Sequence, residues 1–297
     1  MTKPAIGFIG LGLMGSAMVH RLLNLGYGVT IMANRSRPRI DAAVEAGAVE
    51  VGSAKDVAAA ADIVMLCMDT SASVESRMYG DDGVIAGMRP GAVAVDFGTS
   101  LPGSTRKIGD AVTAAGGTYL DAPLGRTPAH AIEGKLNIMA AGDDAAFARI
   151  KPVLSDLGEN VFHLGPLGTG HTIKLMNNFF GMTVAAAMSE AFATCDRAGV
   201  PRQALYDVAS AGPLHSGMMD FVKAYAVDGN PNKLEFSIRN AAKDVGYYAQ
   251  MAEEAGAVSL IAPATKKALS LAVTSGHGDN MVGQLVDVFT ALAGNKG

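Results

Sequence analysis

Residues 5–32, AIGFIGLGLMGSAMVHRLLNLGYGVTIM, change from a strand pattern to a helix pattern and back to a strand pattern. The apolar run at 6–9 is typical of a strand that is buried on both faces of a sheet. Gly10, Gly12 and Gly15 follow in the spacing GxGxxG, and apolar residues at helical spacing come next. Such a turn between a strand and a helix, with a second strand at the right distance, predicts a dinucleotide-binding unit.

The glycines of this turn have a physical role in binding a dinucleotide. Two of them let the backbone turn tightly and approach a pyrophosphate, and the third lets the helix pack closely on the strand. The helix N-terminus then offers free N–H groups to the anion. We therefore expect the cofactor to contact Gly10, Gly12, Leu13, Met14 and Gly15. The alternative is a tight turn that binds no ligand.

The tip of the second strand lacks the acidic residue that usually binds the ribose of NAD. Ala33 stands near this place, and Asn34, Arg35 and Ser36 follow it. A guanidinium group pairs bidentately with phosphate oxygens, so this tip suits the 2′-phosphate of NADP. We expect Asn34, Arg35 and Ser36 to contact the cofactor, with NADP(H) favoured and NAD(H) possible. The alternative is a solvated basic loop.

The rest of the first half alternates strand-like and helix-like segments, which predicts a doubly wound, mostly parallel α/β sheet of the Rossmann type. Ligands bind beyond the carboxyl ends of such strands, which puts Met68 and Thr99 on the cofactor side. We expect a dinucleotide-binding domain at 1–164 and an all-α substrate and dimerisation domain at 165–297. The further strands are expected at 61–68, 92–100, 117–123, 136–142 and 160–165.

The composition of the 297 residues is that of a compact α/β protein, with 49% hydrophobic residues. A formal net charge of −4 argues against general affinity for nucleic acid. Cys67 and Cys195 lie far apart in apolar stretches, as expected of buried free thiols in a reducing compartment. We expect no signal peptide and no membrane span, and hence a cytoplasmic protein. The histidines show no spacing typical of metal ligands.

A long helix is predicted from about residue 171 to residue 198, and its length of about 40 Å is enough to join two domains. One stripe of it contains Lys174, Asn178, Gly181 and Ala185, with Asn177 at the edge. The stripe continues into small residues that a solvent-facing side does not need, and Asn is a poor helix former. We therefore expect the stripe to line a cleft between the domains. A solvated face is the alternative.

Four segments in order resemble the motifs of the β-hydroxyacid dehydrogenase family, which includes 3-hydroxyisobutyrate dehydrogenase. They are GFIGLGLMGSAM (7–18), DAPLGRTPAHAIEGKLNIMAAG (121–142), GTGHTIKLMNN (168–178) and AAKDVGYYAQMAEEAG (241–256). The resemblance covers essentially the whole chain. It implies an NAD(P)-dependent enzyme that forms a homodimer or a homotetramer.

The resemblance also implies roles for single residues. Lys174 corresponds to the catalytic lysine of the family, and Asn178 to the amide that orients the substrate. Lys243 falls near the nicotinamide and the substrate, while Met68 and Thr99 fall where the family contacts the cofactor. Hydride transfer to an aldehyde carbon produces an alkoxide, so Lys174 is the expected proton donor.

The substrate motif departs from the family pattern. Where the family usually has Ser-Gly-Gly, this chain has Gly125, Arg126 and Thr127, as in the branch of 3-sulfolactaldehyde reductase and γ-hydroxybutyrate dehydrogenase. The Arg126 charge suits a sulfonate, or a carboxylate farther from the aldehyde. The alternative is that Arg126 pairs with Asp121 or Glu133 and shapes the loop. The 3-sulfolactaldehyde reductase of that branch uses NADH. This chain is therefore expected to share the substrate pocket of the branch but to prefer NADPH.

The expected substrate is a small acidic aldehyde or hydroxy acid, of the succinic semialdehyde, glyoxylate, tartronate semialdehyde or sulfolactaldehyde type. Asn177 and Lys243 are further candidates for substrate binding. His171, three residues before the lysine, could face the cleft, and His130 in the substrate motif is a further possibility, but both are interpreted as loop or capping residues. Two alternatives share the architecture: an imine reductase, which generally lacks the lysine at 174, and a non-catalytic nucleotide-binding interaction protein. Lys174 favours the dehydrogenase.

Replacement of Arg35 by Ala tests the cofactor hypothesis. If Arg35 binds the 2′-phosphate, kcat/KM with NADPH falls by at least about 10-fold, because a charged hydrogen bond is lost. The value with NADH, which has no such phosphate, stays within about two-fold of the parent. Steady-state kinetics with both cofactors measure the ratio. Equal or better use of NADH by the parent, together with an unchanged ratio in the variant, contradicts the hypothesis.

Overall fold

The computed structural model describes residues 3–33 and 37–292. The chain divides into two compact units, and the boundary falls between Lys174 and Leu175. Each unit has hydrophobic core clusters of its own. The predicted cofactor contacts Asn34, Arg35 and Ser36 lie outside the described residues.

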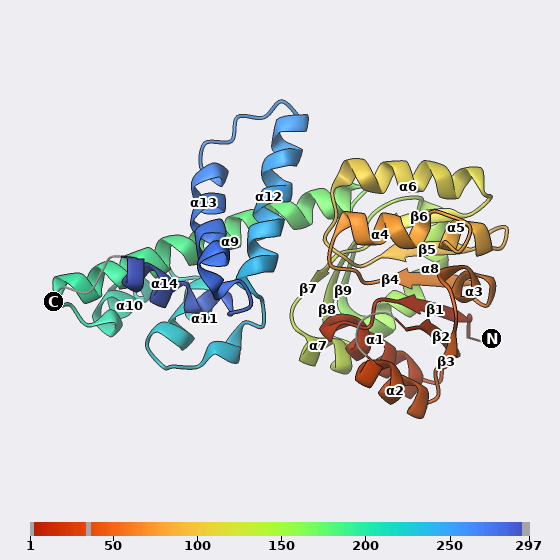
Figure 1. Ribbon diagram of the computed structural model, residues 1–297, viewed down its shortest axis with the longest axis horizontal. Helices are drawn as coiled ribbons and strands as arrows, with labels where there is room; N and C mark the ends of the chain where they lie inside the picture. The colour runs from red at the N-terminus through yellow and green to blue at the C-terminus, as the bar shows by residue number, and fades with distance from the viewer. Residues whose placement is uncertain (1–2, 34–36, 293–297) are drawn as a thin grey trace. The chain divides into compact units, whose positions relative to one another are not determined.

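The first unit is built on a six-stranded sheet in the order β3-β2-β1-β4-β5-β6, in which every neighbouring pair is parallel (Figure 1). The order reverses direction at β1, as in a doubly wound fold. The prediction of a Rossmann-type sheet is therefore confirmed. The strands are β1 (Ile6–Ile9), β2 (Val29–Met32), β3 (Val49–Val51), β4 (Ile63–Leu66), β5 (Val93–Asp96) and β6 (Thr118–Asp121).

Helices cover both faces of this sheet, because the central strands are apolar on both sides. Phe8 packs into the core under α1 and α8, whereas its neighbour Ile9 packs into the core under α3, α4 and α6. Figure 1 shows α4 and α6 on one face, and α1 on the other. The helices are α1 (Leu13–Asn24), α2 (Arg37–Glu45), α3 (Ala54–Ala59), α4 (Ser71–Met78), α5 (Val84–Gly87), α6 (Pro102–Ala114), α7 (Pro128–Glu133) and α8 (Asp144–Leu157).

The segments expected as strands at 136–142 and 160–165 do form strands, but they belong to a separate sheet. This sheet has the order β7-β8-β9 and consists of β7 (Leu124–Gly125), β8 (Leu136–Ala140) and β9 (Gly158–His163). The pair β7 and β8 is antiparallel, so the chain reverses direction after β6 and leaves β6 as the edge of the large sheet. The alternating pattern predicts strands without saying which sheet they join.

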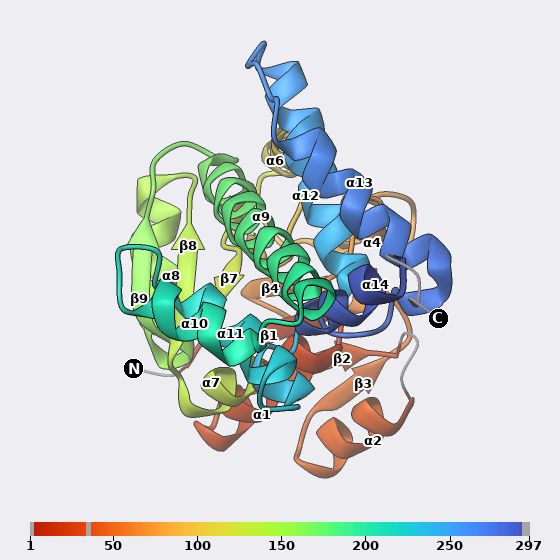
Figure 2. The same ribbon diagram turned by 90° about the vertical axis from the view of Figure 1, so that its left-hand side faces the viewer.

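The second unit is helical, which confirms the prediction of an all-α second half. Its core contains Phe192, Val245, Leu269 and Val286. Helices α12 and α13 lie side by side in both views (Figures 1 and 2). Among the described residues, no helix has both the length and the hydropathy needed to cross a bilayer. The helices are α9 (Thr169–Ala198), which begins in the first unit, α10 (Arg202–Ser210), α11 (Gly217–Ala226), α12 (Ile238–Glu254), α13 (Ala262–Ala272) and α14 (Leu285–Leu292), with the short turns η1 (Pro231–Lys233), η2 (Val273–His277) and η3 (Val282–Gln284).

Candidate functional site

The glycine-rich turn between β1 and α1 has no room for larger side chains at two of its positions. A Cβ atom at Gly10, whose φ is +100°, would lie 2.4 Å from the carbonyl oxygen of Cys67. A Cβ atom at Gly15 would lie 2.0 Å from the carbonyl oxygen of Gly10. These contacts are far shorter than van der Waals separation, so the turn keeps its shape only with glycine there.

Gly12 differs, because a Cβ atom there would meet no atom within 4 Å. It is the N-cap residue of α1, and no side chain caps the helix. The next residue, Leu13, is exposed, and Met14 packs against the core. The N–H groups of the first turn therefore face an open approach, which fits the pyrophosphate of a dinucleotide.

Met68 and Thr99 lie at the same edge of the sheet as this turn. The position of a Gly10 Cβ is 2.8 Å from Met68 Sδ, and that of a Gly98 Cβ is 2.9 Å from the Met68 carbonyl oxygen. Thr99 follows Gly98 directly. The fold thus brings Gly10, Gly15, Met68 and Thr99 together, because β1, β4 and β5 are adjacent parallel strands.

Part of the positive charge after β2 is neutralised within the first unit. The Arg37 guanidinium donates to both carboxylate oxygens of Glu50, at 2.7 and 2.9 Å, and also pairs with Asp41. The hydrogen bonds with Glu50, and then with Asp41, raise the pKa of Arg37. The Arg37 guanidinium is therefore already paired with protein carboxylates. The hypothesis that this segment binds the 2′-phosphate of NADP depends on Arg35.

Arg126 occupies an unusual backbone position in the substrate motif. Its φ of +76° lies in the left-handed region, and no other described residue except glycine has a positive φ. From Nη1 the side chain donates to the carbonyl oxygen of Lys135 at 2.7 Å and forms an ion pair with Glu159. Left-handed backbone at a residue of this size is sparsely populated and is found disproportionately at functional sites.

The two pairing partners considered for Arg126 in the sequence analysis were wrong. Glu133 pairs with Lys135, and the Asp121 carboxylate is used by backbone N–H groups. The actual partner is Glu159, because Gly125 pairs with Asn137 across β7 and β8, and β8 pairs in turn with β9. Only the strand order of the small sheet brings Glu159 to this position.

The other two residues of the motif have local roles. Gly125 ends β7, where a Cβ atom would lie 3.2 Å from the Cβ of Asn137. Thr127 is the N-cap residue of α7, and its Oγ1 lies 2.8 Å from Nδ1 of His130. His130 itself lies within α7, and no side chain caps the N-terminus of this helix, so the interpretation of His130 as a loop or capping residue is not confirmed.

Asp121 holds the start of α9. One carboxylate oxygen accepts from the N–H of Gly168 and the other from the N–H of His171, each at 2.7 Å. Burial raises the pKa of Asp121, while the His171 ring and these N–H groups act in the opposite direction. Gly170 is enclosed there, because a Cβ atom would lie 2.2 Å from the carbonyl oxygen of Met139. Lys174, also in the first unit, follows one helical turn later.

His171 is fully buried and does not face a binding site in the first unit. Its Nδ1 is 2.7 Å from Thr105 Oγ1, and its ring lies 3.7 Å from Asp96 and 3.8 Å from Asp121. The interpretation of His171 as a loop residue was wrong, because the first turn of α9 packs its ring against the ends of β5 and β6.

In the second unit, Asn178 is held by an acidic residue that the sequence analysis did not select. The Asn178 amide donates from Nδ2 to Oδ2 of Asp244 at 2.6 Å, and the other oxygen of Asp244 lies 3.0 Å from Nζ of Lys243. Asp244 is 2% exposed and Asn178 is 9% exposed. Lys243 also lies over the Tyr247 ring at 5.3 Å. One buried carboxylate therefore orients two candidate side chains of this unit, Asn178 and Lys243.

The signal for Asp244 was present in the sequence, next to Lys243 in the segment AAKDVG. Ile238, Ala241 and Val245 form the buried face of α12, and Asp244 lies on the same side. An acidic residue on the apolar face of a helix is costly unless it has partners, which makes it a candidate for a structural or functional role.

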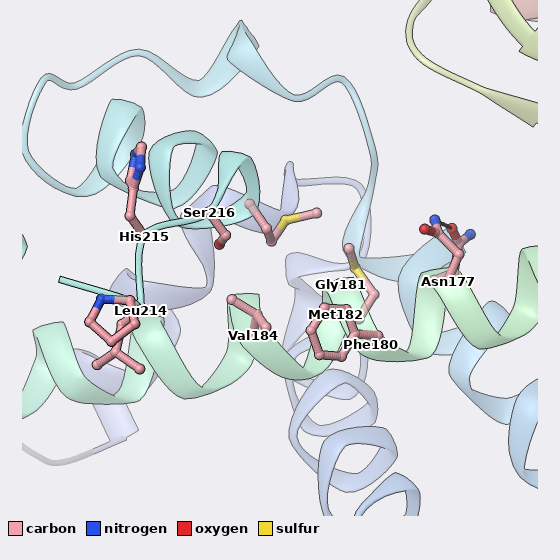
Figure 3. A pocket seen from close by; sticks show the side chains of 11 residues that line it. Asn177, Phe180, Gly181, Met182, Val184, Leu214, His215 and Ser216 are labelled. Atoms are coloured by element: carbon pink, nitrogen blue, oxygen red, sulfur yellow. Dashed lines mark hydrogen bonds between the residues drawn. The ribbon is translucent and has the colours of Figure 1, made fainter. Parts of the chain in front are cut away.

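The stripe on α9 is not a solvated face within the second unit. Asn178 and Ala185 are buried, whereas the large apolar residues Met176 and Phe180 are exposed. A cavity of about 520 Å³, here named the α9 cavity, is lined by α9 residues 177, 178, 180–182 and 184 and by residues 213–216 and 218. Figure 3 shows Asn177 near one end of this stretch of helix and Leu214 and His215 near the other. Asn177 and Asn178 thus border a cavity large enough for a small molecule.

Two family models match the chain. Residues 5–165 match the NAD-binding domain of 6-phosphogluconate dehydrogenase. Residues 168–289 match the model described as NAD-binding of NADP-dependent 3-hydroxyisobutyrate dehydrogenase. The boundary between the models lies just before α9.

Named relatives agree with these models. The chain is 30% identical over 293 residues to probable 3-hydroxyisobutyrate dehydrogenase-like 3, mitochondrial, of Arabidopsis thaliana, which covers 99% of this chain and 89% of the relative. It is 35% identical over 204 residues to 2-hydroxy-3-oxopropionate reductase of Escherichia coli (strain K12), with 67% and 69% covered. The crystal structure of 3-hydroxyisobutyrate dehydrogenase from Salmonella typhimurium superposes with a TM-score of 0.84 at 27% identity, over 96% of this chain and all of that chain.

Replacement of Asp244 by Asn tests the role of the buried carboxylate. The variant keeps the shape of the side chain but removes the charge that holds Asn178 and Lys243. We expect kcat/KM to fall by about 10-fold or more, since hydrogen bonds to charged groups contribute about 1.5–3 kcal/mol. Steady-state kinetics and thermal unfolding measure both effects. Asp279→Asn, at an exposed ion pair with Arg239, is the matched control and stays within about 0.5 kcal/mol of the parent. Parent-like kinetics in Asp244→Asn contradict the assignment.

Proposed function

Because the chain belongs to the β-hydroxyacid dehydrogenase family of NAD(P)-dependent enzymes that act on CH–OH groups, we propose that it interconverts a small acidic aldehyde and its hydroxy acid. The observation that carries this proposal is the combination of a glycine turn shaped for a dinucleotide with Lys174 and Asn178 one turn apart on α9. We assign residues 1–164 to a dinucleotide-binding domain, which also supplies the anion site described below, and residues 165–297 to an all-α domain for further substrate contacts and for subunit contacts.

Lys174 is the proposed acid and base of the reaction. The bound nicotinamide supplies or accepts the hydride. As the carbonyl oxygen gains charge, the Lys174 ammonium hydrogen-bonds to it and donates the proton, and in the reverse direction the neutral amine removes it. The backbone before Lys174 is anchored by Asp121, which supports a fixed position for the ammonium group.

Asn178 orients the substrate from the next turn of the same helix. Its Nδ2 group is engaged by Asp244, which fixes the rotamer of the amide. Lys243 is paired with the same carboxylate. From the family resemblance, we propose that its positive charge acts on the nicotinamide and the substrate. Asn177, at the edge of the α9 cavity, is the second amide proposed to contact the substrate.

The anionic end of the substrate is assigned to Gly125, Arg126 and Thr127. Among the described residues, both polar contacts of Arg126 use Nη1, so the Nη2 and Nε groups remain for an anion. A planar guanidinium suits the oxygens of a sulfonate or a carboxylate. The proposed substrates are therefore of the succinic semialdehyde, glyoxylate, tartronate semialdehyde or sulfolactaldehyde type.

NADP(H) is the proposed preferred cofactor, on the strength of Asn34, Arg35 and Ser36 in the sequence. A cytoplasmic location is supported by the free thiols of Cys67 and Cys195, which are typical of a reducing compartment. A homodimer or homotetramer follows from the family resemblance. The alternatives are an imine reductase-like enzyme and a non-catalytic nucleotide-binding protein, and Lys174 argues against both.

Replacement of Lys174 by Ala tests the proposed chemistry. Loss of the proton donor is expected to lower kcat by about 100-fold to 10,000-fold. The Kd for NADPH, measured by fluorescence titration, should change less than about three-fold, because Lys174 does not take part in the glycine turn. Lys151→Ala, at an exposed site on α8, serves as the control. Activity of Lys174→Ala within tenfold of the parent excludes Lys174 as the acid.

Replacement of Arg126 by Ala tests the anion site. The panel contains succinic semialdehyde, glyoxylate, tartronate semialdehyde and sulfolactaldehyde, each with NADPH and with NADH. We expect a loss of kcat/KM of about 10-fold or more for the substrates whose anion reaches Arg126, and a smaller loss for the others. Glu159→Gln removes the ion pair but keeps the guanidinium, and should retain activity. An equal loss for every substrate, or no loss, refutes the role of Arg126.

A further inference from the structure

The α9 cavity is larger and more apolar than a short acidic aldehyde requires. Its volume is about 520 Å³, within the range of about 300–1,000 Å³ typical of sites for much larger ligands. Met182, Val184, Leu214 and Met218 contribute apolar walls. Among the described residues that line it, no Lys, Arg, Asp or Glu side chain is present.

Apart from Ser216, whose hydroxyl accepts from the N–H of Met219, the polar side chains named here lie near the ends of the cavity. Asn177 stands near one end, and His215 lies near the other in Figure 3. The Nε2 atom of His215 is 3.0 Å from Oδ1 of Asp220, so this ring is already paired with a carboxylate. An anion inside the cavity would therefore have no cationic partner among the described lining residues, and its burial would be unfavourable.

A glycine, Gly181, stands on α9 one turn after the asparagine pair and lines the cavity. A Cβ atom at Gly181 would lie 3.1 Å from Met218 Cε, which is tighter than ordinary packing. Any larger side chain at this position would therefore enter the space between α9 and residues 213–218. Gly is an unfavourable choice within a helix, by about 1 kcal/mol relative to Ala. Its presence inside a 30-residue helix thus agrees with a need for open space.

We propose that the substrate carries an uncharged apolar substituent, and that this substituent occupies the α9 cavity beside Asn178. The inference rests on the proposed function, in which Asn178 orients the reacting end of the substrate. Because Asn178 also lines the cavity, a substituent on the carbon chain next to the reacting group enters it directly. The enzyme then prefers branched alkyl or aryl hydroxy acids over the shortest members of the class.

A second copy of the chain is the competing occupant. Phe180 is 70% exposed and Leu214 is 73% exposed, and both line the cavity. The continuity of the cavity with the buried amide of Asn178 favours the substrate, since a subunit contact does not require an oriented amide at its border. The competing occupant is therefore one outcome of the experiment.

The test measures the oxidation of 3-hydroxypropionate and of its 2-methyl, 2-butyl and 2-benzyl derivatives with NADP⁺. Each buried methylene should raise kcat/KM by about four-fold. The 2-butyl acid should therefore exceed the unsubstituted acid by at least about 10-fold. Turnover of the short acids without this gain overturns the inference and leaves the proposed function standing. If no acid or aldehyde of either panel is turned over, the proposed function itself is wrong.

Variants of Gly181 test whether the preference for larger substituents arises in the α9 cavity. In Gly181→Leu, the gain from the butyl and benzyl groups should be lost, so that the ratio of kcat/KM for the 2-butyl acid to kcat/KM for 3-hydroxypropionate falls from at least about 10 to about 1. Gly181→Ala introduces a smaller side chain that favours helix formation, and it should lose part of the gain. It provides the test if the Leu variant does not fold. Ala187→Leu adds the same bulk at an exposed position of α9 outside the cavity, and should keep the parent profile.

Light scattering after size-exclusion chromatography completes the experiment. The parent and the Gly181 variants should have the same molar mass, because the cavity is proposed to hold substrate. If Gly181→Leu changes the molar mass while the dependence on substituent size is unaffected, a second copy of the chain covers the cavity. That result overturns the inference.

Discussion

The position of Lys174, the proposed proton donor, depends on the two hydrogen bonds that the Asp121 carboxylate accepts at the start of α9. The carboxylate lies at the end of β6, fully buried, and receives the N–H groups of Gly168 and His171. Hydrogen bonds to a charged group contribute about 1.5–3 kcal/mol each, and an unpaired buried carboxylate would cost at least as much. A negative charge at a helix N-terminus is also favoured by the helix dipole. The sheet therefore fixes the first turn of the helix that carries Lys174.

A similar arrangement occurs in the second unit. Asp244 is buried on the inner face of α12 and binds Asn178 on α9. Lys174 and Asn178 thus each depend on an acid from another element, Asp121 in the first unit and Asp244 in the second. Functional groups held by packed helices and buried hydrogen bonds keep their geometry better than groups on loops. The roles of Asp121 and Asp244 are to position other groups, and neither is assigned contact with the substrate.

Within the substrate motif, Arg126 has an unusual backbone conformation that its side-chain contacts stabilise. Left-handed backbone at Arg126 costs about 1–3 kcal/mol, and the structure offsets it with the Glu159 ion pair and the bond to the Lys135 carbonyl. Glu159 lies on β9 of the small sheet, and Lys135 directly precedes β8 of the same sheet. These two contacts hold the Arg126 side chain beside Gly125 and Thr127.

The sequence by itself determined the Rossmann-type sheet, the helical second half and the family. These follow from local patterns: glycines that no other residue can replace at 10 and 15, buried apolar strands, and helical spacing along α9. Only the tertiary structure decided which sheet β8 and β9 join, that Glu159 rather than Asp121 or Glu133 pairs with Arg126, that His171 is buried, and that Asp244 holds Asn178. Each of these depends on residues far apart in the chain. Hydrophobic periodicity shows on which face of its helix or strand a residue lies. Side-chain pairing and burial depend on the neighbours that the complete fold brings to that residue.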